Sequence, residues 1–280
     1  MTAPHPPPVL AATDLDRTLV HSARAAGPVE PGTTVRLEQR HGAVTAQLAH
    51  RTAAALAALD RHALWVPATT RSVAQYRRLD LDRRLGVAPR FVVCANGGVL
   101  LVDGEPDPAW AAALGRLLEA SAPRAEVTGH LAGHLARLEA PGPVRDVDGR
   151  LLVVRARHPA GWLDELVAWC EPHGWRVDAH RDEIRLLPAA LTKSAAVAEV
   201  RRRTGASRLV AAGDSPLDAD LLLAADAGIT PVDGRLHAAG WRADHVAVTA
   251  AGGLGAGEEI AAWLRTRADE GRRRAGGPVS

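Results

Sequence analysis

The sequence contains few cysteines, few aromatic residues and a single lysine. It has two cysteines, one methionine and 3% aromatic residues. Two cysteines are too few for a disulfide framework or a cysteine-rich metal site. Cys94 and Cys170 both lie in apolar surroundings, so we expect buried, reduced thiols. The histidines at 130, 134, 158, 173 and 180 are scattered without metal-ligand spacing, so we interpret them as structural or surface residues, although His130 and His134 could share a helix face.

Long apolar runs and strong net charge are also missing. No stretch is apolar enough to span a membrane, so we expect no membrane association. A formal net charge of +2 is too small to predict nucleic acid as a partner. Residues 1–8 show no basic-then-apolar signal pattern, and we therefore expect a cytoplasmic protein.

What the chain does contain is typical of a globular protein. At 280 residues, with 47% apolar and 24% charged residues, it can form one large or two modest domains. Among 34 basic residues, only Lys193 is a lysine. A lysine kept where arginine dominates indicates a need for a compact ammonium group at that position. Chance retention is the alternative interpretation.

The stretch 9–20 organises the prediction, because an apolar run ends there in two carboxylates and a hydroxyl. The run suits a strand buried on both faces. Ligands of open α/β sheets bind at the carboxyl ends of strands, which is where Asp14, Asp16 and Thr18 stand. Nearby carboxylates stay ionised together when a cation lies between them, so the pattern indicates a Mg²⁺-dependent phosphoryl site. A solvated turn is the alternative.

A second strand end carries hydroxyls and a base. The predicted strand 64–68 runs into Thr69, Thr70 and Arg71 before a predicted helix at 73–79. Free N–H groups at a helix start favour an anion, and a plain Ser/Thr cap is the alternative. Asn96 follows a predicted strand at 90–95 and could face the same pocket, although Asn-Gly is more simply a tight turn.

Two later segments add a cation and more carboxylates. Lys193 stands at the start of a predicted helix at 195–203, where a cation opposes the helix dipole unless an anion lies beside it. The predicted strand 208–212 ends in Gly213, Asp214 and Ser215, and Asp218 begins a helix. Asp214 and Asp218 therefore extend the acidic group, unless Asp218 is only a helix cap.

The order of predicted elements indicates an α/β fold with an insertion. We expect a discontinuous Rossmann-like core, 1–98 and 189–280, with a mostly parallel sheet flanked by helices. Residues 99–188 form a predicted α+β domain whose tryptophans make its own core. In the core we also expect a hairpin in 21–47, a helix at 53–61 capped by Thr52, and a last helix at 258–267. The glycine-rich run 252–257 is predicted to be a flexible loop, and the tail 269–280 is predicted to fray.

These segments, in this order, resemble the motifs of the haloacid dehalogenase (HAD) superfamily of phosphohydrolases. Asp-Leu-Asp-Arg-Thr at 14–18 looks like the first motif and Thr-Thr-Arg at 69–71 the second. Lys193 looks like the third, and Gly-Asp-Ser-Pro-Leu-Asp at 213–218 the fourth. The insert is similar to the C2-type cap of the Cof-like and sucrose-phosphatase-like branch. Arg17 and Thr70 stand where glycine is commonest, and Leu217 stands where asparagine is frequent in Cof-like relatives. These differences bear on substrate and rate more than on reaction type.

The resemblance implies a role for each residue. Asp14 would be the nucleophile and Asp16 the general acid and base, while Thr69 and Lys193 would hold the phosphoryl oxygens. Mg²⁺ would be held by Asp14, the backbone carbonyl of Asp16 and Asp214, with Asp218 in support. Further substrate contacts are expected from Thr18, Thr70, Arg71, Asn96, Ser215, Arg181 and Arg185.

The sequence therefore predicts a Mg²⁺-dependent phosphatase that hydrolyses a small phosphorylated metabolite, such as a sugar phosphate, through an aspartyl-phosphate. A phosphomutase is an alternative, as is a non-catalytic protein that binds a phosphate ester on the same fold. We expect a monomer or homodimer that binds neither nucleic acid nor membranes.

Overall fold

A parallel five-stranded sheet forms the centre of the computed structural model, which describes residues 9–59 and 62–275. The strand order is β14-β13-β12-β1-β4, and every neighbouring pair is parallel. The strands are β1 (Val9–Thr13), β4 (Leu64–Pro67), β12 (Arg208–Ala212), β13 (Ala227–Thr230) and β14 (Val246–Val248). The predicted α/β class is confirmed.

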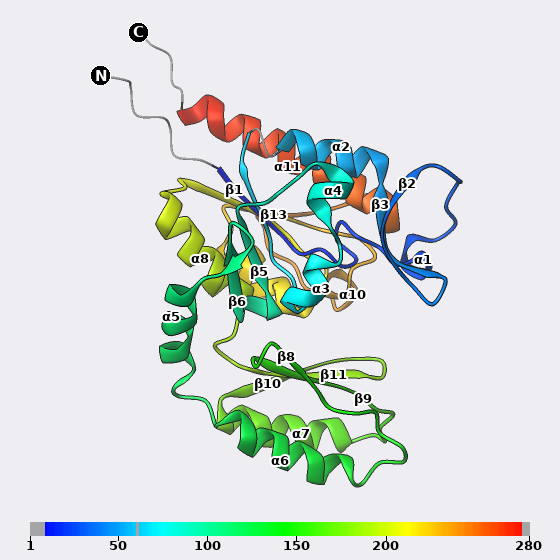
Figure 1. The fold of residues 1–280 in the computed structure, drawn as a ribbon, viewed down its shortest axis with the longest axis vertical. Coiled ribbons are helices and arrows are strands. Elements are labelled where there is room, and N and C mark those ends of the chain that lie inside the picture. Colours follow the sequence, from blue (N-terminus) through cyan, green and yellow to red (C-terminus); the bar gives the residue numbers. More distant parts are fainter. Residues whose placement is uncertain (1–8, 60–61, 276–280) are drawn as a thin grey trace.

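Helices cover both faces of this sheet (Figure 1). Alternate residues of β1 enter two buried clusters, Val9 and Ala11 in one, Leu10 and Ala12 in the other. The first cluster is closed by α2 (His50–Leu59) and α11 (Gly253–Ala275), and the second by α8 (Lys193–Thr204) and α9 (Ala219–Ala224). Successive side chains of a strand point to opposite faces, so an unbroken apolar run fits a strand buried on both sides.

Smaller elements surround the central sheet. An antiparallel sheet of β5 (Phe91–Cys94), β6 (Val99–Val102) and β7 (Glu105–Pro106) is joined to the end of β4 by a bridge between Ala68 and Val93. The predicted hairpin is formed by β2 (Thr34–Arg40) and β3 (Ala43–Ala49). The remaining elements here are α1 (Ala23–Ala26), α3 (Val73–Arg77), α4 (Leu81–Leu85), α5 (Pro108–Leu118), α10 (Arg235–Ala238) and 3-10 turns at Ala95–Gly97 and Pro216–Asp218.

A second layer, which we call the cap layer, consists of an antiparallel sheet with two helices on one face (Figure 1). Its strand order is β10-β11-β9-β8. The elements are α6 (Arg124–Leu135), β8 (Arg145–Val147), β9 (Leu151–Arg155), α7 (Trp162–Cys170), a 3-10 turn at Glu171–His173, β10 (Trp175–His180) and β11 (Glu183–Pro188). A separate buried cluster joins α6 and α7 to the sheet.

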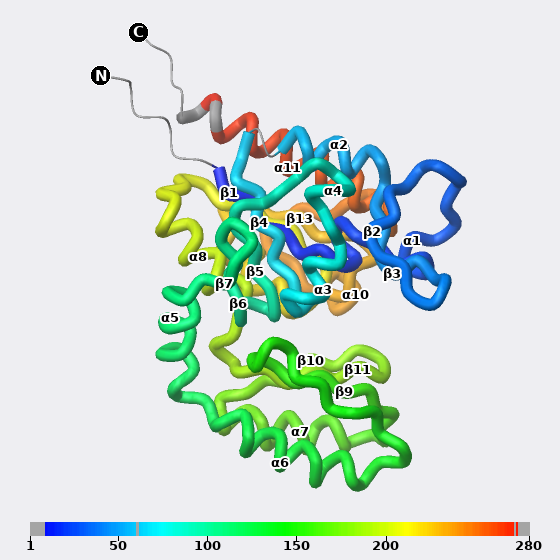
Figure 2. The backbone as a smooth tube through the Cα atoms, viewed as in Figure 1, coloured from blue at the N-terminus to red at the C-terminus, as the bar shows by residue number. Residues whose placement is uncertain are grey.

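The chain passes between the two layers after α5 and returns between β11 and α8, as Figure 2 shows. Trp162 and Trp175 belong to the cap layer's own cluster. Trp110 does not, because it packs with the central-sheet cluster and its indole N–H donates to the carbonyl of Gly97 at 2.8 Å. The prediction that Trp110 belongs to the insert's core is therefore wrong, while the boundaries 99 and 188 stay a prediction.

Several local predictions are corrected. Thr52 lies inside α2, which begins at His50, so it is not the helix cap. Residues 253–257 of the glycine-rich run form the first turns of α11, and 269–275 continue that helix instead of fraying. Glycine disfavours helix in isolation, but tertiary packing of Ala256, Ile260 and Leu264 outweighs that preference. The rest of the predicted tail lies outside the described residues, as do residues 1–8.

Candidate active site

The carboxyl ends of three adjacent parallel strands bring the predicted residues to one edge of the sheet. β1 lies between β4 and β12, with Thr13 opposite both Pro67 and Ala212. The backbone N–H of Asp14 donates to the carbonyl of Ala212 at 2.8 Å, so the sheet ladder itself fixes this residue. Asp14, Thr69 and Asp214 then follow the three strand ends.

Lys193 lies between two carboxylates at the centre of the site. Its Nζ is 2.6 Å from Asp14 Oδ1 and 2.6 Å from Asp218 Oδ1, and its side chain is fully buried. Burial lowers the pKa of a lysine, but the two carboxylates outweigh it and raise the pKa of Lys193 above its ordinary value. The ammonium is therefore held charged between Asp14 and Asp218.

The loop after β5 positions the turn that carries Lys193. The amide of Asn96 donates to the carbonyl of Leu191 at 2.9 Å. Gly97 has a φ of +102°, and a Cβ there would lie 2.1 Å from the carbonyl oxygen of Thr192. Only glycine permits this approach. The structure thus places Asn96 behind Lys193, fully buried, as part of the support for the site and not on its open side.

Asp218 organises the loop after β12. Its Oδ2 accepts hydrogen bonds from the backbone N–H groups of Asp214 and Ser215 and from the Ser215 hydroxyl, at 3.1, 2.9 and 2.8 Å. Its other oxygen accepts from Lys193. A Cβ on Gly213 would lie 2.3 Å from the Asp218 side chain, so glycine is needed there. Both oxygens of Asp218 are occupied, which fits support of the site better than direct metal ligation.

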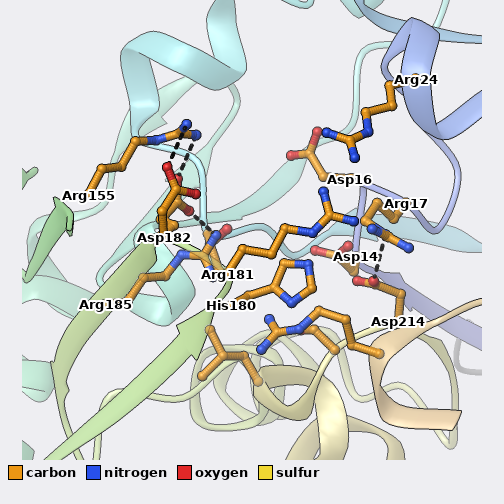
Figure 3. Close-up of a pocket in the computed structure, with 15 residues that line it drawn as sticks. Asp14, Asp16, Arg17, Arg24, Arg155, His180, Arg181, Asp182, Arg185 and Asp214 are labelled. Carbon is orange, nitrogen blue, oxygen red and sulfur yellow. Dashed lines mark hydrogen bonds and ion pairs between the residues drawn. The ribbon is translucent and has the colours of Figure 1, made fainter. Parts of the chain in front are cut away.

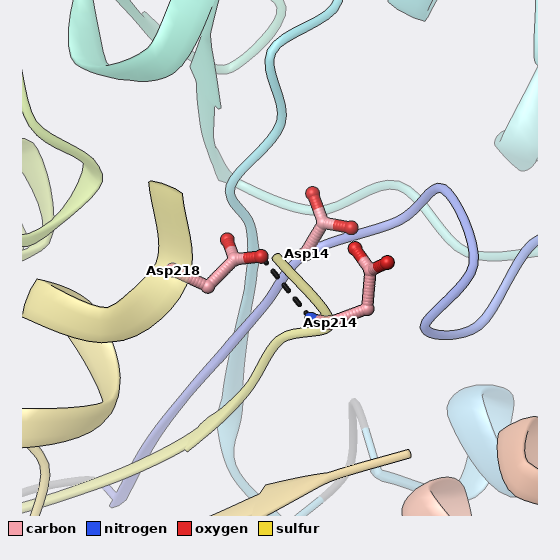
Figure 4. Close-up of side chains that lie close together, drawn as sticks. All are labelled: Asp14, Asp214 and Asp218. Atoms are coloured by element: carbon pink, nitrogen blue, oxygen red, sulfur yellow. Dashed lines mark hydrogen bonds between the residues drawn. The ribbon is translucent and has the colours of Figure 1, made fainter. Parts of the chain in front are cut away.

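Asp14 and Asp214 carry more negative charge than the surrounding cations balance. Burial raises the pKa of Asp14 to about 7 despite Lys193, and burial together with Asp14 and Asp218 raises the pKa of Asp214 well above its ordinary value. Asp214 Oδ2 is buried without a hydrogen bond, and Arg17 Nε lies 3.5 Å from it. Within the described residues, the only group with metal-ligand geometry is Asp14, Asp214 and Asp218, each with one oxygen within 4.8 Å of the others (Figure 4). This donor set suits a hard divalent cation.

Asp16 and Arg71 form a bidentate ion pair at the edge of the site. Arg71 Nε and one terminal nitrogen each lie 2.7 Å from an Asp16 oxygen. Burial opposes the charge of Arg71, but Asp16 and Glu38 raise its pKa. The Asp16 carboxylate is thus outside the metal-binding group, and Arg71, predicted as a substrate contact, is placed on Asp16 instead.

The predicted hydroxyl groups are divided between the interior and the cavity. The hydroxyl of Thr18 donates to Asp14 Oδ2 at 3.2 Å, and Thr18 is fully buried. Thr69 is also fully buried, and its oxygen accepts from the N–H of Arg71. Thr70 and Ser215 line the cavity.

A cavity of about 500 Å³ opens in front of Asp14, between the strand ends and the cap layer (Figure 3). The predicted Arg181 and Arg185 line it from the β10–β11 hairpin. The sequence analysis missed the other charged or polar lining residues, which are Arg24, Arg155, His180, Asp182, Glu183 and Arg235. None of them lies in a motif, and only their shared position across the cavity could reveal them. Arg17, which stands where glycine is commonest in the first motif, also lines the cavity.

The remaining titratable candidates are structural. Cys94 and Cys170 are free and buried, as predicted, and burial raises both thiol pKa values. His134 is buried against Trp162, with its Nε2 2.9 Å from the Trp162 carbonyl oxygen. Among the helices that the structure describes, none has the length and apolar character that a membrane span requires.

Comparison with known proteins identifies the fold. No protein-family model and no curated protein sequence matches the chain. Solved structures match over nearly its whole length. The sucrose-phosphatase of Synechocystis sp. PCC6803, in complex with sucrose and phosphate, is 18% identical, with a TM-score of 0.64 over 91% of this chain and 97% of the other.

Two further solved structures match the fold of this chain. The HAD subclass IIB sugar phosphatase BT4131 is 14% identical, with a TM-score of 0.62 over 92% of this chain and 99% of that one. A trehalose-6-phosphate phosphatase related protein is 14% identical, with a TM-score of 0.53 over 93% and 99%. The chain therefore has the fold of these phosphatase structures over nearly its whole length.

Proposed function

We propose that the protein is a Mg²⁺-dependent phosphatase that hydrolyses a phosphate monoester of a small metabolite. The observation that carries the proposal is the buried Lys193 held at 2.6 Å from both Asp14 and Asp218, with Asp214 beside them at the floor of the cavity. The similar folds of a sucrose-phosphatase and a sugar phosphatase support it. The alcohol part of the ester would be a sugar or a compound of similar size.

The residues at the strand ends fit a magnesium ion. Asp14 and Asp214 offer carboxylate oxygens, one of which lacks a hydrogen-bond partner in the described structure. The backbone carbonyl of Asp16 would complete the protein ligands. Bound Mg²⁺ would offset the negative charge that the ester and the two carboxylates bring together.

The proposed reaction has two steps. The Asp14 carboxylate attacks phosphorus, the ester P–O bond breaks, and the leaving alkoxide takes a proton from Asp16, which gives an aspartyl-phosphate. Asp16 then removes a proton from water, which attacks that phosphorus and releases phosphate and free Asp14. Lys193 and the Thr69 hydroxyl stabilise the phosphoryl oxygens. Arg71 positions Asp16 through two hydrogen bonds, and one of them must open for Asp16 to carry the proton that it donates.

A substrate panel tests the proposal. The purified protein is incubated with phosphorylated metabolites, with Mg²⁺ or with EDTA, and free phosphate and sugar phosphates are measured separately. Phosphate release that depends on Mg²⁺, without an isomerised sugar phosphate, is the expected result. Isomerisation without phosphate release would instead indicate a phosphomutase, and binding without turnover would indicate a non-catalytic protein.

A further inference from the structure

The charged side chains around the cavity are largely paired with one another. Glu183 pairs with Arg155 at 3.1 Å and also with Arg185. Asp16 pairs with Arg71, and Arg17 lies 3.5 Å from Asp214. These guanidinium groups are already engaged by carboxylates of the protein.

Arg24 and Arg181 differ from the other arginines that line the cavity. Within the described residues, neither has a hydrogen bond or a carboxylate at ion-pair distance, and both are exposed. Arg24 comes from α1 in the core, and Arg181 comes from the turn between β10 and β11 in the cap layer. In Figure 3 the side chain of Arg181 extends across the cavity toward Arg17 and Asp14, and that of Arg24 enters from the core side.

The backbone at Arg181 gives a second, independent observation. Arg181 has a φ of +57°, in the left-handed region, at the first position of the two-residue turn between His180 and Glu183. Glycine, asparagine and aspartate adopt this conformation at lower energy than arginine does. A long cation at a strained position that faces a cavity indicates that its side chain is needed there.

The phosphoryl group does not require these two arginines. Lys193, the Thr69 hydroxyl and a cation held by Asp14 and Asp214 would provide its charge partners. Two unpaired guanidinium groups therefore remain in the cavity for a further group of the substrate.

We infer that the substrate carries a second anionic group, a carboxylate or another phosphate, on its alcohol part, and that Arg24 and Arg181 bind it. This inference rests on the proposed function and narrows its substrate class. Guanidinium groups bind carboxylate and phosphate through paired, charge-assisted hydrogen bonds. Arg24 from the core and Arg181 from the cap layer would together select for esters that bear a second anionic group.

Matched esters test the inference. We compare kcat/KM for glucose 6-phosphate, 6-phosphogluconate and glucose 1,6-bisphosphate, which share a C6 phosphate and carry a hydroxyl, a carboxylate (in an open chain) and a second phosphate at C1. The protein should prefer one or both anionic esters over glucose 6-phosphate by about tenfold or more, the size of one charge-assisted interaction. A preference for 6-phosphogluconate identifies a carboxylate, and a preference for the bisphosphate identifies a second phosphate.

Variants of the two arginines test whether they cause the preference for anionic esters. In the double variant Arg24→Gln/Arg181→Gln, the ratio of kcat/KM between the preferred ester and glucose 6-phosphate should fall to near 1, mainly through KM. Arg116→Gln, which removes an exposed charge from α5, should leave the ratio unchanged. An equal loss on all three esters would overturn the inference, because the arginines would then bind the phosphoryl group.

A binding measurement separates this inference from the proposed function. Calorimetric titration of the Asp14→Asn variant with glucose 6-phosphate and 6-phosphogluconate measures selectivity without turnover, and glucose 1,6-bisphosphate serves as the third ligand. Selective binding without hydrolysis by the unmodified protein would retain the inference and reject the phosphatase. Hydrolysis of all three esters with equal kcat/KM would retain the phosphatase and reject the inference.

Discussion

The two walls of the cavity differ in how their charges are held. On the core wall, Asp14, Lys193 and Asp218 are at most 5% exposed, and each contacts a group of opposite charge. On the cap wall, Arg181 and Asp182 are exposed at the tip of a hairpin. Buried charges keep their geometry because moving one would leave its partner unpaired in a medium of low polarity. Exposed charges can move at little cost.

This difference matches two tasks of a phosphatase. Every phosphate ester presents the same reacting group, so the proposed chemistry can be assigned to a rigid, preorganised wall. The alcohol part differs between esters, so its contacts can come from side chains that are still solvated before binding. The core wall should therefore respond to substitution through kcat, and the cap wall through KM and selectivity.

The largest expected effect comes from Asp14→Asn on the core wall. An amide cannot attack phosphorus to form the acyl phosphate, so we expect kcat to fall by more than about 10³-fold. The variant should still fold, because the amide can keep the contact with Lys193. Phosphate release and thermal unfolding measure the two outcomes. Asp244→Asn, an exposed carboxyl-to-amide change, is the control. Turnover at the unmodified rate would remove Asp14 from the role of nucleophile.

Lys193→Arg should have the next largest effect. The change keeps the charge but places a larger, planar group in a fully buried space between two carboxylates. We expect about a 10²-fold loss of kcat and a loss of about 1–3 kcal/mol in the free energy of unfolding. Arg202→Lys, on the exposed face of the same helix, is the reverse control. An unchanged kcat would show that the site does not require a compact ammonium group.

The same contrast explains what the sequence could predict. The core wall follows from local patterns, since apolar runs predict strands and their ends carry Asp14, Thr69 and Asp214. The lone Lys193 was conspicuous because 34 basic residues include no other lysine. Partners within that wall were less visible. The pairing of Asp16 with Arg71, 55 residues away, depends on the relative placement of two strand ends.

The cap wall could not be predicted in the same way. Arg181 and Arg185 were expected to contact the substrate, but they face Arg24 of the core across one cavity only because the cap layer sits over the carboxyl edge of the central sheet. No spacing in the sequence encodes that placement. The loop prediction for the glycine run at 252–257 was wrong for a related reason. The local preference of glycine predicted a loop, but burial of one face of α11 against the sheet stabilises a helix there.

Metal binding tests the core wall without changing its shape. At pH 8, above the pKa of about 7 for Asp14, the Asp14 carboxylate is available to Mg²⁺. A concentration of a hundred times Kd should stabilise the protein by about 2.7 kcal/mol relative to EDTA, seen as a higher Tm. The shift should shrink at pH 5.5, below the pKa of about 7 for Asp14, because protons then compete with Mg²⁺ for the Asp14 carboxylate. Asp214→Asn should abolish it, and an equal shift in that variant would place the ion elsewhere.

The smallest expected effect concerns the junction of the two walls, where Arg235 of α10 contacts Asp178 of β10 at 2.9 Å. Burial opposes the charge of Asp178, but Arg235 and Arg185 lower its pKa. A lowered folded-state pKa contributes stability above the unfolded pKa, and that stability is lost as the pH falls through the folded value. Arg235→Gln should therefore cost about 1 kcal/mol at pH 7 and less near pH 3.5. Arg185 still contacts the carboxylate at 2.7 Å, which limits the loss.

Urea unfolding at the two pH values measures this difference. Arg242→Gln is the matched control, because Arg242 donates to carbonyl oxygens near the end of α10 and contacts no carboxylate in the described structure. A loss of the same size at both pH values would mean that Arg235 stabilises the junction by packing. A loss confined to pH 7 would show that the ion pair between Arg235 and Asp178 holds the cap layer against the core. The exposed arginines of the cap layer could then change while its position over Asp14 is kept.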